Sequence, residues 1–433
     1  MHLNQTPGSI PESKVKRQLL ESEDVPNIYL GQGLIFVPPE EAVEEYNAYL
    51  KGKDLNPAHL PLGVIQRKGN GGDIYNSPRL DQVWDKIYRE QMKTGFRTPE
   101  AFGTFIREQS RGTIQKLFQI DADEIATTQV DNLMQALGNV QAVIPKLAPT
   151  HVSRVILPQK YKYSGHTDFT SRAIEVGTDL EVVEVPEIQI DGTQDLGALK
   201  KAFEKIKTEG RVAIFIDQEH NNNPTGYDRD PAQNDELIKL LKEYEGVVFY
   251  FGDNAYKGLK KDVVEPYPLM QGLIDNEVTA FHYTSFTKLG NYRGTPANKN
   301  ILTATPGTFA NKKTLRAAFK ATQRSRGIGA NEDGAILMNK LVADPDFQKE
   351  IRVLNQYLQF TRDSIFKALQ GSDLAPLFGP NTSGIFRCLP PEVTAKLNSG
   401  DKQVITVGDR VNIWPLGDPR NRQFFTDKVQ QSA

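Results

Sequence analysis

Short apolar segments alternate with amphipathic helical segments through the middle of this chain, and this alternation restricts its fold more than any other feature. Residues 196–207 and 234–244 have apolar positions at helical spacing, and similar patterns lie at 80–92 and 130–144. The apolar runs are short and rich in β-branched and aromatic residues, and they lie at 154–157, 180–185, 212–216, 247–251 and 278–283. Such strands, separated by helices, are typical of a mostly parallel sheet covered on both faces. The pattern therefore predicts an α/β fold.

The pattern changes after residue 329, where helical spacing replaces the alternation. Apolar positions over 347–369 predict one long amphipathic helix, and strand-like patterns return near 383–389 and 404–414. A chain of 433 residues fits two closely packed domains. We predict three parts of the chain, which are an N-terminal arm at 1–30, a large domain at 76–328, and a small domain built from 31–75 and 329–433.

Composition excludes several classes of protein. The chain is 38% hydrophobic and has a formal net charge of −2 without a basic tract, so the electrostatic footprint of a nucleic-acid binder is missing. No run approaches the ~20 apolar residues of a membrane span. The polar N-terminal residues lack an apolar signal core. Cys388 is the one cysteine, so we expect neither internal disulfides nor a cysteine-rich metal site. We expect a cytoplasmic protein that binds no metal, nucleic acid or membrane.

Three polar segments each follow a predicted buried strand. They are Asn-Pro-Thr-Gly at 223–226, Asp253 with Tyr256 in Asp-Asn-Ala-Tyr, and Ser285 with Lys288 in Ser-Phe-Thr-Lys. Taken singly, each has an ordinary explanation, such as a turn, a helix cap or a structural lysine. Ligands of parallel sheets collect at the carboxyl ends of strands, so we predict that the three segments share one site.

The groups in these segments match what pyridoxal 5'-phosphate (PLP) requires of a protein. The amine of Lys288 can form a Schiff base and, when freed, can carry the proton of the substrate α-carbon. Asp253 can pair with the pyridinium nitrogen and keep the ring an electron sink. The Asn223 amide and the Tyr256 phenol can hydrogen-bond the 3-oxygen of the ring. We therefore predict a PLP site with Lys288 as its catalytic residue.

The same segments resemble the motifs of the aspartate aminotransferase family of fold-type I PLP-dependent enzymes. The resemblance extends from about residue 31 to residue 429. It implies a large domain with a mostly parallel seven-stranded sheet and a smaller α+β domain. Near the C-terminus, Gly-Asp-Arg-Val-Asn at 408–412 is similar to the family's Gly-Arg-Val-Asn, with one inserted acidic residue. By this resemblance, Arg410 holds the substrate α-carboxylate, with Asn223 and Gly33 as further substrate contacts.

The resemblance also implies contacts to the phosphate and the ring of the cofactor. Ser285 and Arg293 are expected at the phosphate, together with Asn132 and backbone amides at the start of a helix. Tyr161 is expected to stack on the ring, and Tyr163 is the next choice. Tyr75 resembles the tyrosine that reaches the neighbouring subunit's phosphate. The resemblance therefore implies a homodimer with shared sites.

Two departures from the family pattern keep the reaction open. Residues 129–132 are Gln-Val-Asp-Asn where the family has small residues, and the spacing from Lys288 to Arg293 is short. Our first hypothesis is a PLP-dependent aminotransferase that moves an amino group between an α-amino acid and a 2-oxo acid. The alternatives are another PLP reaction on this fold (a lyase, oxidase or hydroxylase) and a non-catalytic PLP-binding regulator. The substrate side chain is not predicted. Arg324 and Arg326 would suit an acidic one, although a position on a helix surface explains them better, and Phe36, Tyr161 and Tyr163 would suit an aromatic one.

Overall fold

The structure is a computed structural model of the 433-residue chain. It describes residues 28–29, 38–53, 68–69, 72–73, 79, 82–83, 86, 99–121, 125–148, 154–163, 165–166, 180–260, 262–286, 288–289, 300–325, 332–379, 382–399, 404–405 and 409–430.

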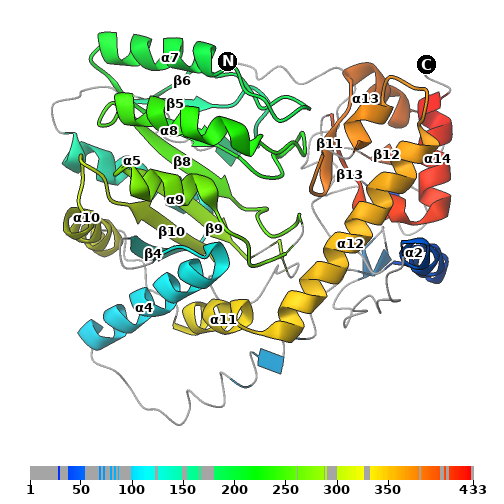
Figure 1. The fold of residues 1–433 in the computed structure, drawn as a ribbon, viewed down its shortest axis with the longest axis horizontal. Coiled ribbons are helices and arrows are strands. Elements are labelled where there is room, and N and C mark those ends of the chain that lie inside the picture. The colour runs from blue at the N-terminus through cyan, green and yellow to red at the C-terminus, as the bar shows by residue number, and fades with distance from the viewer. Residues whose placement is uncertain are drawn as a thin grey trace.

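A seven-stranded sheet forms the centre of the molecule (Figure 1). In spatial order, its strands are β4 (Ala126–Val130), β10 (Asn300–Thr305), β9 (Ala280–Ser285), β8 (Val248–Asn254), β7 (Val212–Asp217), β5 (Arg154–Pro158) and β6 (Leu180–Val182). Every pair from β9 to β6 is parallel, whereas β10 runs antiparallel to both of its neighbours. The predicted mostly parallel sheet is confirmed, with β10 as its reversed strand.

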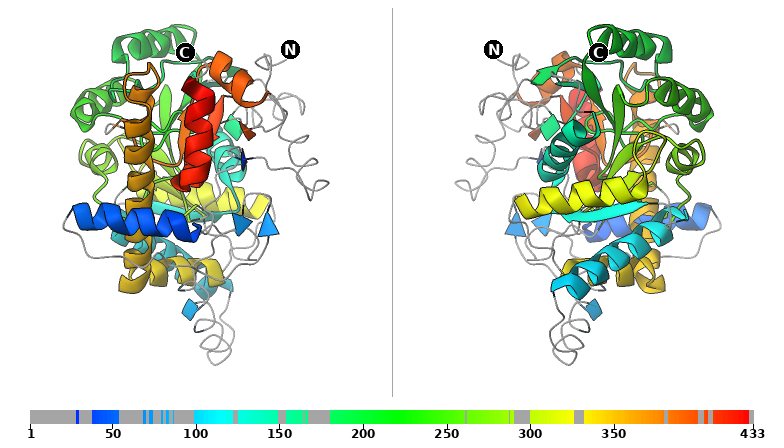
Figure 2. Two further views of the ribbon diagram at one scale, coloured as in Figure 1. Left: turned by 90° about the vertical axis from the view of Figure 1, so that its right-hand side faces the viewer. Right: turned by 90° about the vertical axis from the view of Figure 1, so that its left-hand side faces the viewer.

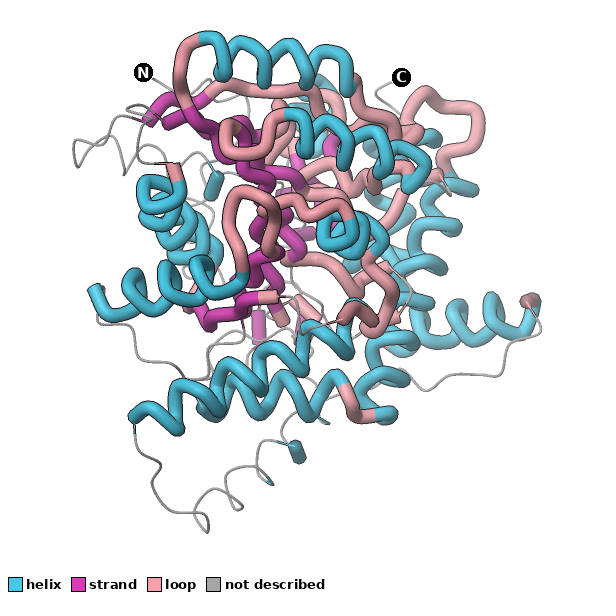
Figure 3. The backbone as a smooth tube through the Cα atoms, turned by 60° about the vertical axis from the view of Figure 1, so that its left-hand side comes forward, coloured by secondary structure: helices cyan, strands magenta, loops and turns pink. Residues whose placement is uncertain are grey.

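Helices cover both faces of this sheet, and Figure 3 shows the strands running between them. Because side chains alternate along a strand, neighbouring residues of one strand enter different cores. Leu157 and Phe215 belong to the core that contains α7 (Leu196–Thr208), α8 (Asn234–Glu243) and α9 (Pro268–Asp275). Ile156 and Ile214 belong to the second core, which contains α5 (Leu133–Leu147) and α10 (Lys312–Ser325).

Two strands of the seven-stranded sheet have no counterpart among the predicted ones. β4 has the sequence Ala-Thr-Thr-Gln-Val, and β10 begins with Asn300, yet every residue of both strands is buried. A search for apolar runs misses them because hydroxyl and amide side chains fill half of their positions. Val130, which the sequence pattern assigned to the following helix, is the last residue of β4, and α5 starts at Leu133.

The elements outside the sheet include one long helix, α12 (Pro345–Ala368), which confirms the predicted helix at 347–369. Figure 2 shows α12 beside α14 (Pro419–Gln430) and crossed by α2 (Glu40–Gly52), and both pairs are in contact. Among the described residues, the other α-helices are α4 (Pro99–Phe118), α11 (Glu332–Val342) and α13 (Pro391–Leu397). Three small two-stranded sheets pair β1 (Ile28–Tyr29) with β12 (Val404–Ile405), β2 (Lys68–Gly69) with β3 (Gly72–Asp73), and β11 (Phe386–Cys388) with β13 (Arg410–Asn412).

The division into an arm and two domains stays a prediction, since much of 1–98 lies outside the described residues. Within the described part of the chain, no helix is both long enough and apolar enough to cross a membrane.

Candidate active site

The carboxyl ends of five strands meet at one edge of the sheet and surround a cavity of about 280 Å³. β10 runs the opposite way, so its first residue, Asn300, also lies at this edge. The lining residues come from all of these strand ends, and they are Asp131, Asn132, Leu133, Met134, Tyr163, Gln218, Asp253, Ala255, Tyr256, Tyr283, Ser285, Lys288 and Asn300. The structure thus brings together Asp253, Tyr256, Ser285 and Lys288, which follow different strands in the sequence.

Asp253 lies near the end of β8 and is 2% exposed. Its Oδ2 atom lies 3.0 Å from Nε2 of His166 and accepts a hydrogen bond of 2.9 Å from Nε2 of Gln218. Its Oδ1 atom accepts a hydrogen bond of 3.1 Å from the backbone N–H of Ala255. Turns rather than a helix follow Asp253, so its carboxylate is not a helix cap. Three contacts instead fix the orientation of a buried acidic group at the cavity wall.

Lys288 and Tyr256 lie close to each other in the wall of this cavity. The Nζ atom of Lys288 lies 5.6 Å from the centre of the Tyr256 ring. Burial raises the pKa of the Tyr256 phenol, and the nearby charge of Arg410 opposes that rise. The phenol oxygen accepts a hydrogen bond of 3.2 Å from Nδ2 of Asn223. Tyr256 is therefore a neutral phenol at physiological pH and can act as a donor.

Arg410 is the first residue of β13 and connects to the same group of residues through Asn223. Its guanidinium donates a hydrogen bond of 3.1 Å to Oδ1 of Asn223 and lies 4.6 Å from the centre of the Phe386 ring. The carboxylate of the neighbouring Asp409 accepts a hydrogen bond of 2.7 Å from the Thr394 hydroxyl. Asn223 thus holds Tyr256 with its amide nitrogen and Arg410 with its amide oxygen.

The start of α5 forms another part of the cavity wall. Asn132 is the residue before the helix, and its side chain accepts a hydrogen bond of 2.9 Å from the backbone N–H of Gln135. Oδ2 of Asp131 accepts a hydrogen bond of 2.9 Å from the Gln135 side chain. Asn132 therefore caps the helix, and Leu133 and Met134 of the first turn also line the cavity. An N-terminal helix turn of this kind favours an anion.

The structure favours Tyr163 over Tyr161 as the aromatic residue of the site. Tyr163 lines the cavity, and its ring lies 5.9 Å from that of His166, edge to face. Among the described residues, Tyr161 is not part of that lining, and it is 44% exposed with Lys160 over its ring. The sequence pattern alone did not distinguish the two because both follow β5 within five residues.

Four predicted residues are not positioned by the structure. Gly33, Tyr75, Arg293 and Arg326 lie outside the described residues, as does the side chain of Arg324. Their roles stay predictions.

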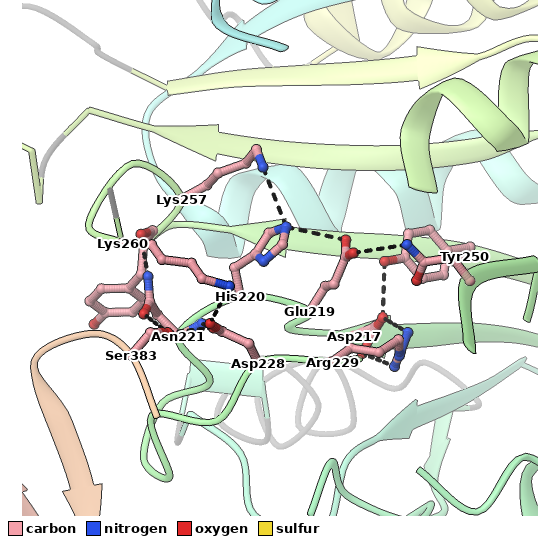
Figure 4. Close-up of polar contacts among 12 residues, drawn as sticks. Asp217, Glu219, His220, Asn221, Asp228, Arg229, Tyr250, Lys257, Lys260 and Ser383 are labelled. Atoms are coloured by element: carbon pink, nitrogen blue, oxygen red, sulfur yellow. Dashed lines mark hydrogen bonds and ion pairs between the residues drawn. The ribbon is translucent and has the colours of Figure 1, made fainter. Parts of the chain in front are cut away.

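A buried ion pair closes the loop that carries Asn223 (Figure 4). Arg229 donates two hydrogen bonds of 2.8 Å to the two oxygens of Asp217, and both side chains are fully buried. Tyr250 donates a hydrogen bond of 3.0 Å to the same carboxylate. Since Asp217 ends β7, this pair anchors both ends of the loop from 217 to 229 to the sheet.

The same loop is joined to the segment before β11. The Ser383 hydroxyl lies within hydrogen-bond distance of side-chain oxygens of both Asn221 and Asp228 and can donate to one of them at a time (Figure 4). Its backbone N–H donates a hydrogen bond of 3.0 Å to the carbonyl of Gly226. Gly226 has a φ of 73°, and a Cβ there would overlap the Phe386 carbonyl. The glycine of Asn-Pro-Thr-Gly is therefore required by both its backbone angle and this close approach.

His166 and Gln218 are the two contacts of Asp253 that sequence reasoning missed. His166 is one of six histidines and has no motif around it. Gln218 directly follows the last residue of β7. The rule that selected Asn223, which is a polar residue just past a buried strand, would also have selected Gln218.

Comparisons with known proteins support the fold. No family model matches the sequence, and no curated protein matches it. Among solved structures, an aromatic amino acid aminotransferase from Burkholderia cenocepacia J2315 superposes with a TM-score of 0.69 at 18% identity, over 100% of this chain and 98% of that one.

Two further structures give the same result. A cytoplasmic aspartate aminotransferase from Giardia lamblia has a TM-score of 0.69 at 16% identity, over 100% of this chain and 98% of that one. An aromatic amino acid aminotransferase from Burkholderia pseudomallei, covalently bound to pyridoxal phosphate, has a TM-score of 0.64 at 16% identity, over 100% of both chains. The chain therefore has the fold of the aspartate and aromatic amino acid aminotransferases, as its motifs predicted.

Proposed function

We propose that this protein is a PLP-dependent aminotransferase that moves an amino group between an α-amino acid and a 2-oxo acid. The observation that carries the proposal is the cavity itself, where the Lys288 amine, the Asp253 carboxylate and the Tyr256 phenol lie together at one edge of the sheet. Arg410 joins them through Asn223. The shared fold supports the proposal, because neighbours with this fold are named as aminotransferases and one is named as bound to PLP.

The residues of the cavity fit the groups of PLP. Lys288 would hold the cofactor covalently, and Asp253 would pair with its ring nitrogen. Tyr256 and Asn223 would donate to its 3-oxygen. Ser285 lies at the cavity and would contact the phosphate.

Other residues would complete the cofactor site. The start of α5 at Asn132 would face the phosphate through backbone amides, together with Arg293. An aromatic residue would cover the ring, and Tyr163 is better placed for this than Tyr161. Once bound, the cofactor would supply an electron-withdrawing ring that stabilises negative charge at the substrate α-carbon.

The reaction itself depends on two residues of this chain. Arg410 would grip the substrate α-carboxylate through two parallel hydrogen bonds, and Gly33 would contribute to substrate binding. Lys288, in its neutral amine form, would take the proton from the α-carbon and return it to the cofactor. Since one arginine can grip amino acid and 2-oxo acid alike, the same site would serve both halves of the reaction.

The cellular setting and assembly belong to this proposal as well. We propose a cytoplasmic homodimer in which Tyr75 of each subunit completes the site of the other. The substrates are small amino acids and 2-oxo acids, and neither nucleic acid nor a membrane is a partner.

Replacing the proposed catalytic lysine tests the function. Wild-type protein incubated with PLP should show visible absorbance, and borohydride should fix the cofactor to the peptide that contains Lys288. In Lys288→Ala, both signals should disappear. The matched control is Lys160→Ala, which removes an exposed lysine near the same sheet edge and should leave both signals unchanged. Fixation of the cofactor on another lysine in Lys288→Ala would contradict the site.

A product assay separates transamination from the alternatives. With an amino acid as the only substrate, an aminotransferase should release one 2-oxo acid per site and leave the cofactor in its amine form. Addition of a different 2-oxo acid should then restore the visible band. Release of carbon dioxide, peroxide or a side-chain fragment would instead indicate another PLP reaction. A cofactor spectrum that no amino acid changes would indicate a regulator.

A further inference from the structure

Gln218 lies between two groups of the proposed site and contacts both of them. It directly follows β7 and is 2% exposed. Its Nε2 atom donates a hydrogen bond of 2.9 Å to Oδ2 of Asp253. Its Oε1 atom accepts a hydrogen bond of 3.0 Å from the backbone N–H of Asn223. One buried amide therefore connects the carboxylate of one strand end to the loop of the next.

The connection continues beyond Asn223. The side chain of Asn223 accepts the hydrogen bond from Arg410 and donates one to Tyr256. The guanidinium of Arg410 and the carboxylate of Asp253 are thus joined through the two intermediate residues, Asn223 and Gln218.

Residues on either side of Gln218 are held by buried side-chain contacts, which fix the segment that carries its side chain. Before it, Asp217 is held by Arg229 in the buried ion pair. After it, Nδ2 of Asn222 donates to Oε1 of Gln159, whose own amide donates a hydrogen bond of 2.6 Å to Asp217.

An amide has a property that this position requires. It offers a donor and an acceptor at the same time and carries no charge at any physiological pH. The other side-chain partner of Asp253 is His166, whose donor capacity depends on its tautomer and protonation. The hydrogen bond from Gln218 to Asp253 does not depend on the tautomer or the protonation of a donor. In a buried network, a hydrogen bond of this kind is stronger than in water.

We propose that Gln218 is a positioning residue that ties the substrate-carboxylate grip at Arg410 to the orientation of the Asp253 carboxylate. This rests on the proposed function for the roles of Arg410 and Asp253. In this arrangement, loss of Gln218 disturbs both ends of the site, although Gln218 itself reacts with nothing.

Two substitutions of Gln218 distinguish the effects of its two hydrogen bonds. Gln218→Met keeps the volume of the side chain and removes both bonds. Gln218→Glu keeps an acceptor for Asn223 but places a carboxylate oxygen against Asp253 instead of a donor. The measurements are the dissociation constant of PLP for the cofactor-free protein, the dissociation constant of an unreactive dicarboxylate for the PLP-loaded protein, and amide hydrogen exchange of 218–227 in the cofactor-free protein.

Gln218→Met should weaken both PLP and dicarboxylate binding by about tenfold or more, as expected for a buried hydrogen bond to a charged group. It should also speed hydrogen exchange over 218–227. Gln218→Glu should weaken PLP binding by a similar factor, but should leave exchange and dicarboxylate affinity near the wild-type values. Gln141→Met is the control, because Gln141 is buried in α5 and does not line the cavity.

Two results would overturn the inference. One is that Gln218→Met binds both ligands and exchanges as the wild type does. The other is that Met and Glu variants lose both affinities equally, which would make Gln218 a general packing residue. Failure of the proposed function is seen separately. Wild-type protein that does not bind PLP would reject the cofactor site, and the product assay would reject transamination, whereas the exchange experiment would still report on the Gln218–Asn223 bond.

Discussion

At the scale of single residues, the site depends on side chains that are held by more than one partner. Asp253 has contacts from His166, Gln218 and the Ala255 amide, and Asn223 bridges Tyr256 and Arg410. Groups held in this way keep one geometry before a ligand arrives, and this preorganisation is a main source of catalytic power.

Removal of the Asp253 carboxylate should therefore affect turnover far more than binding. In Asp253→Ala, the ring nitrogen loses its anionic partner, so kcat should fall by about 100-fold or more, with each tenfold step costing ~1.4 kcal/mol of barrier. The variant should still retain some PLP through Lys288. Steady-state kinetics and the cofactor absorbance measure the two effects. Turnover close to the wild-type rate would remove Asp253 from the mechanism.

Arg410 should prove sensitive even to a change that keeps its charge. Arg410→Lys loses the planar two-point grip, so half-reactions with amino acids and with 2-oxo acids should both slow by about 10- to 100-fold. The cofactor spectrum should stay nearly unchanged. An arginine in a surface ion pair would contribute only ~0–1 kcal/mol. Equal rates in Arg410→Lys and wild type, measured by stopped-flow absorbance over several amino acids, would place the carboxylate grip elsewhere.

Sequence reasoning reached some residues of the site and missed others for identifiable reasons. Lys288, Asp253 and Tyr256 follow strands that are strongly apolar, so their place at the sheet edge could be predicted. His166 could not, because it lies eight residues beyond the end of β5, no motif surrounds it, and its partner is 87 residues away in the chain.

At the scale of secondary-structure elements, α12 combines a well-predicted boundary with a buried carboxyl group. Its start is defined by Asp344, which accepts from the backbone amides of Asp346 and Phe347 and is paired with Arg79. Its buried face includes Glu350, which is 7% exposed. Burial raises the pKa of Glu350 to about 8, and the backbone N–H of Arg79 opposes this by hydrogen-bonding the carboxylate.

This buried carboxyl group should make stability depend on pH. Between the ordinary glutamate pKa and about 8, Glu350 is ionised in the unfolded chain but neutral in the folded protein, so stability falls as pH rises through this range. Glu350→Gln removes that dependence. The variant should therefore match wild type near pH 4.5 and exceed it at pH 8 by about 3–5 kcal/mol.

Urea denaturation at both pH values measures the difference. Glu236→Gln serves as the control, because Glu236 is exposed on α8, and its effect should not change with pH. A difference between Glu350→Gln and wild type that is the same at both pH values would show that Glu350 is ionised in the folded protein.

The sheet shows how far elements could be predicted. Five strands were found from apolar runs, because a strand covered by helices on both faces needs apolar residues throughout. β4 and β10 were not found. Several of their buried polar groups are satisfied by groups outside these two strands, such as Thr305 donating to the Val278 carbonyl and Tyr283 donating to Asn300. That compensation is a property of the assembled sheet and not of the local sequence.

At the scale of the whole molecule, the fold places residues from the middle and from the C-terminal part of the chain near one another. Arg410, close to the C-terminus, contacts Asn223, 187 residues earlier. The overall architecture could be predicted from the alternation of strands and helices. The prediction of a site shared between subunits depends on Tyr75, and the role of Tyr75 comes from resemblance alone.

Mixing two inactive variants tests that shared site. Lys288→Ala lacks the catalytic amine, and Tyr75→Ala would lack the contact that each subunit gives to its partner. In a hybrid dimer, one site would combine an intact Lys288 with an intact Tyr75. Joint unfolding and refolding of the two variants should therefore restore activity that neither shows alone. Mixtures no more active than the separate variants, together with a monomer in sedimentation, would reject the shared-site dimer.

The Asp217–Arg229 pair has a consequence for how this sequence can vary over evolutionary time. Loss of one partner would leave a buried charge without compensation, at a cost of about 3–5 kcal/mol, while joint replacement by apolar residues can be nearly neutral. Single substitutions at either position are therefore selected against, and the two positions should change together or not at all. Among distant descendants of this chain, an aspartate at the end of β7 should come with an arginine twelve positions later.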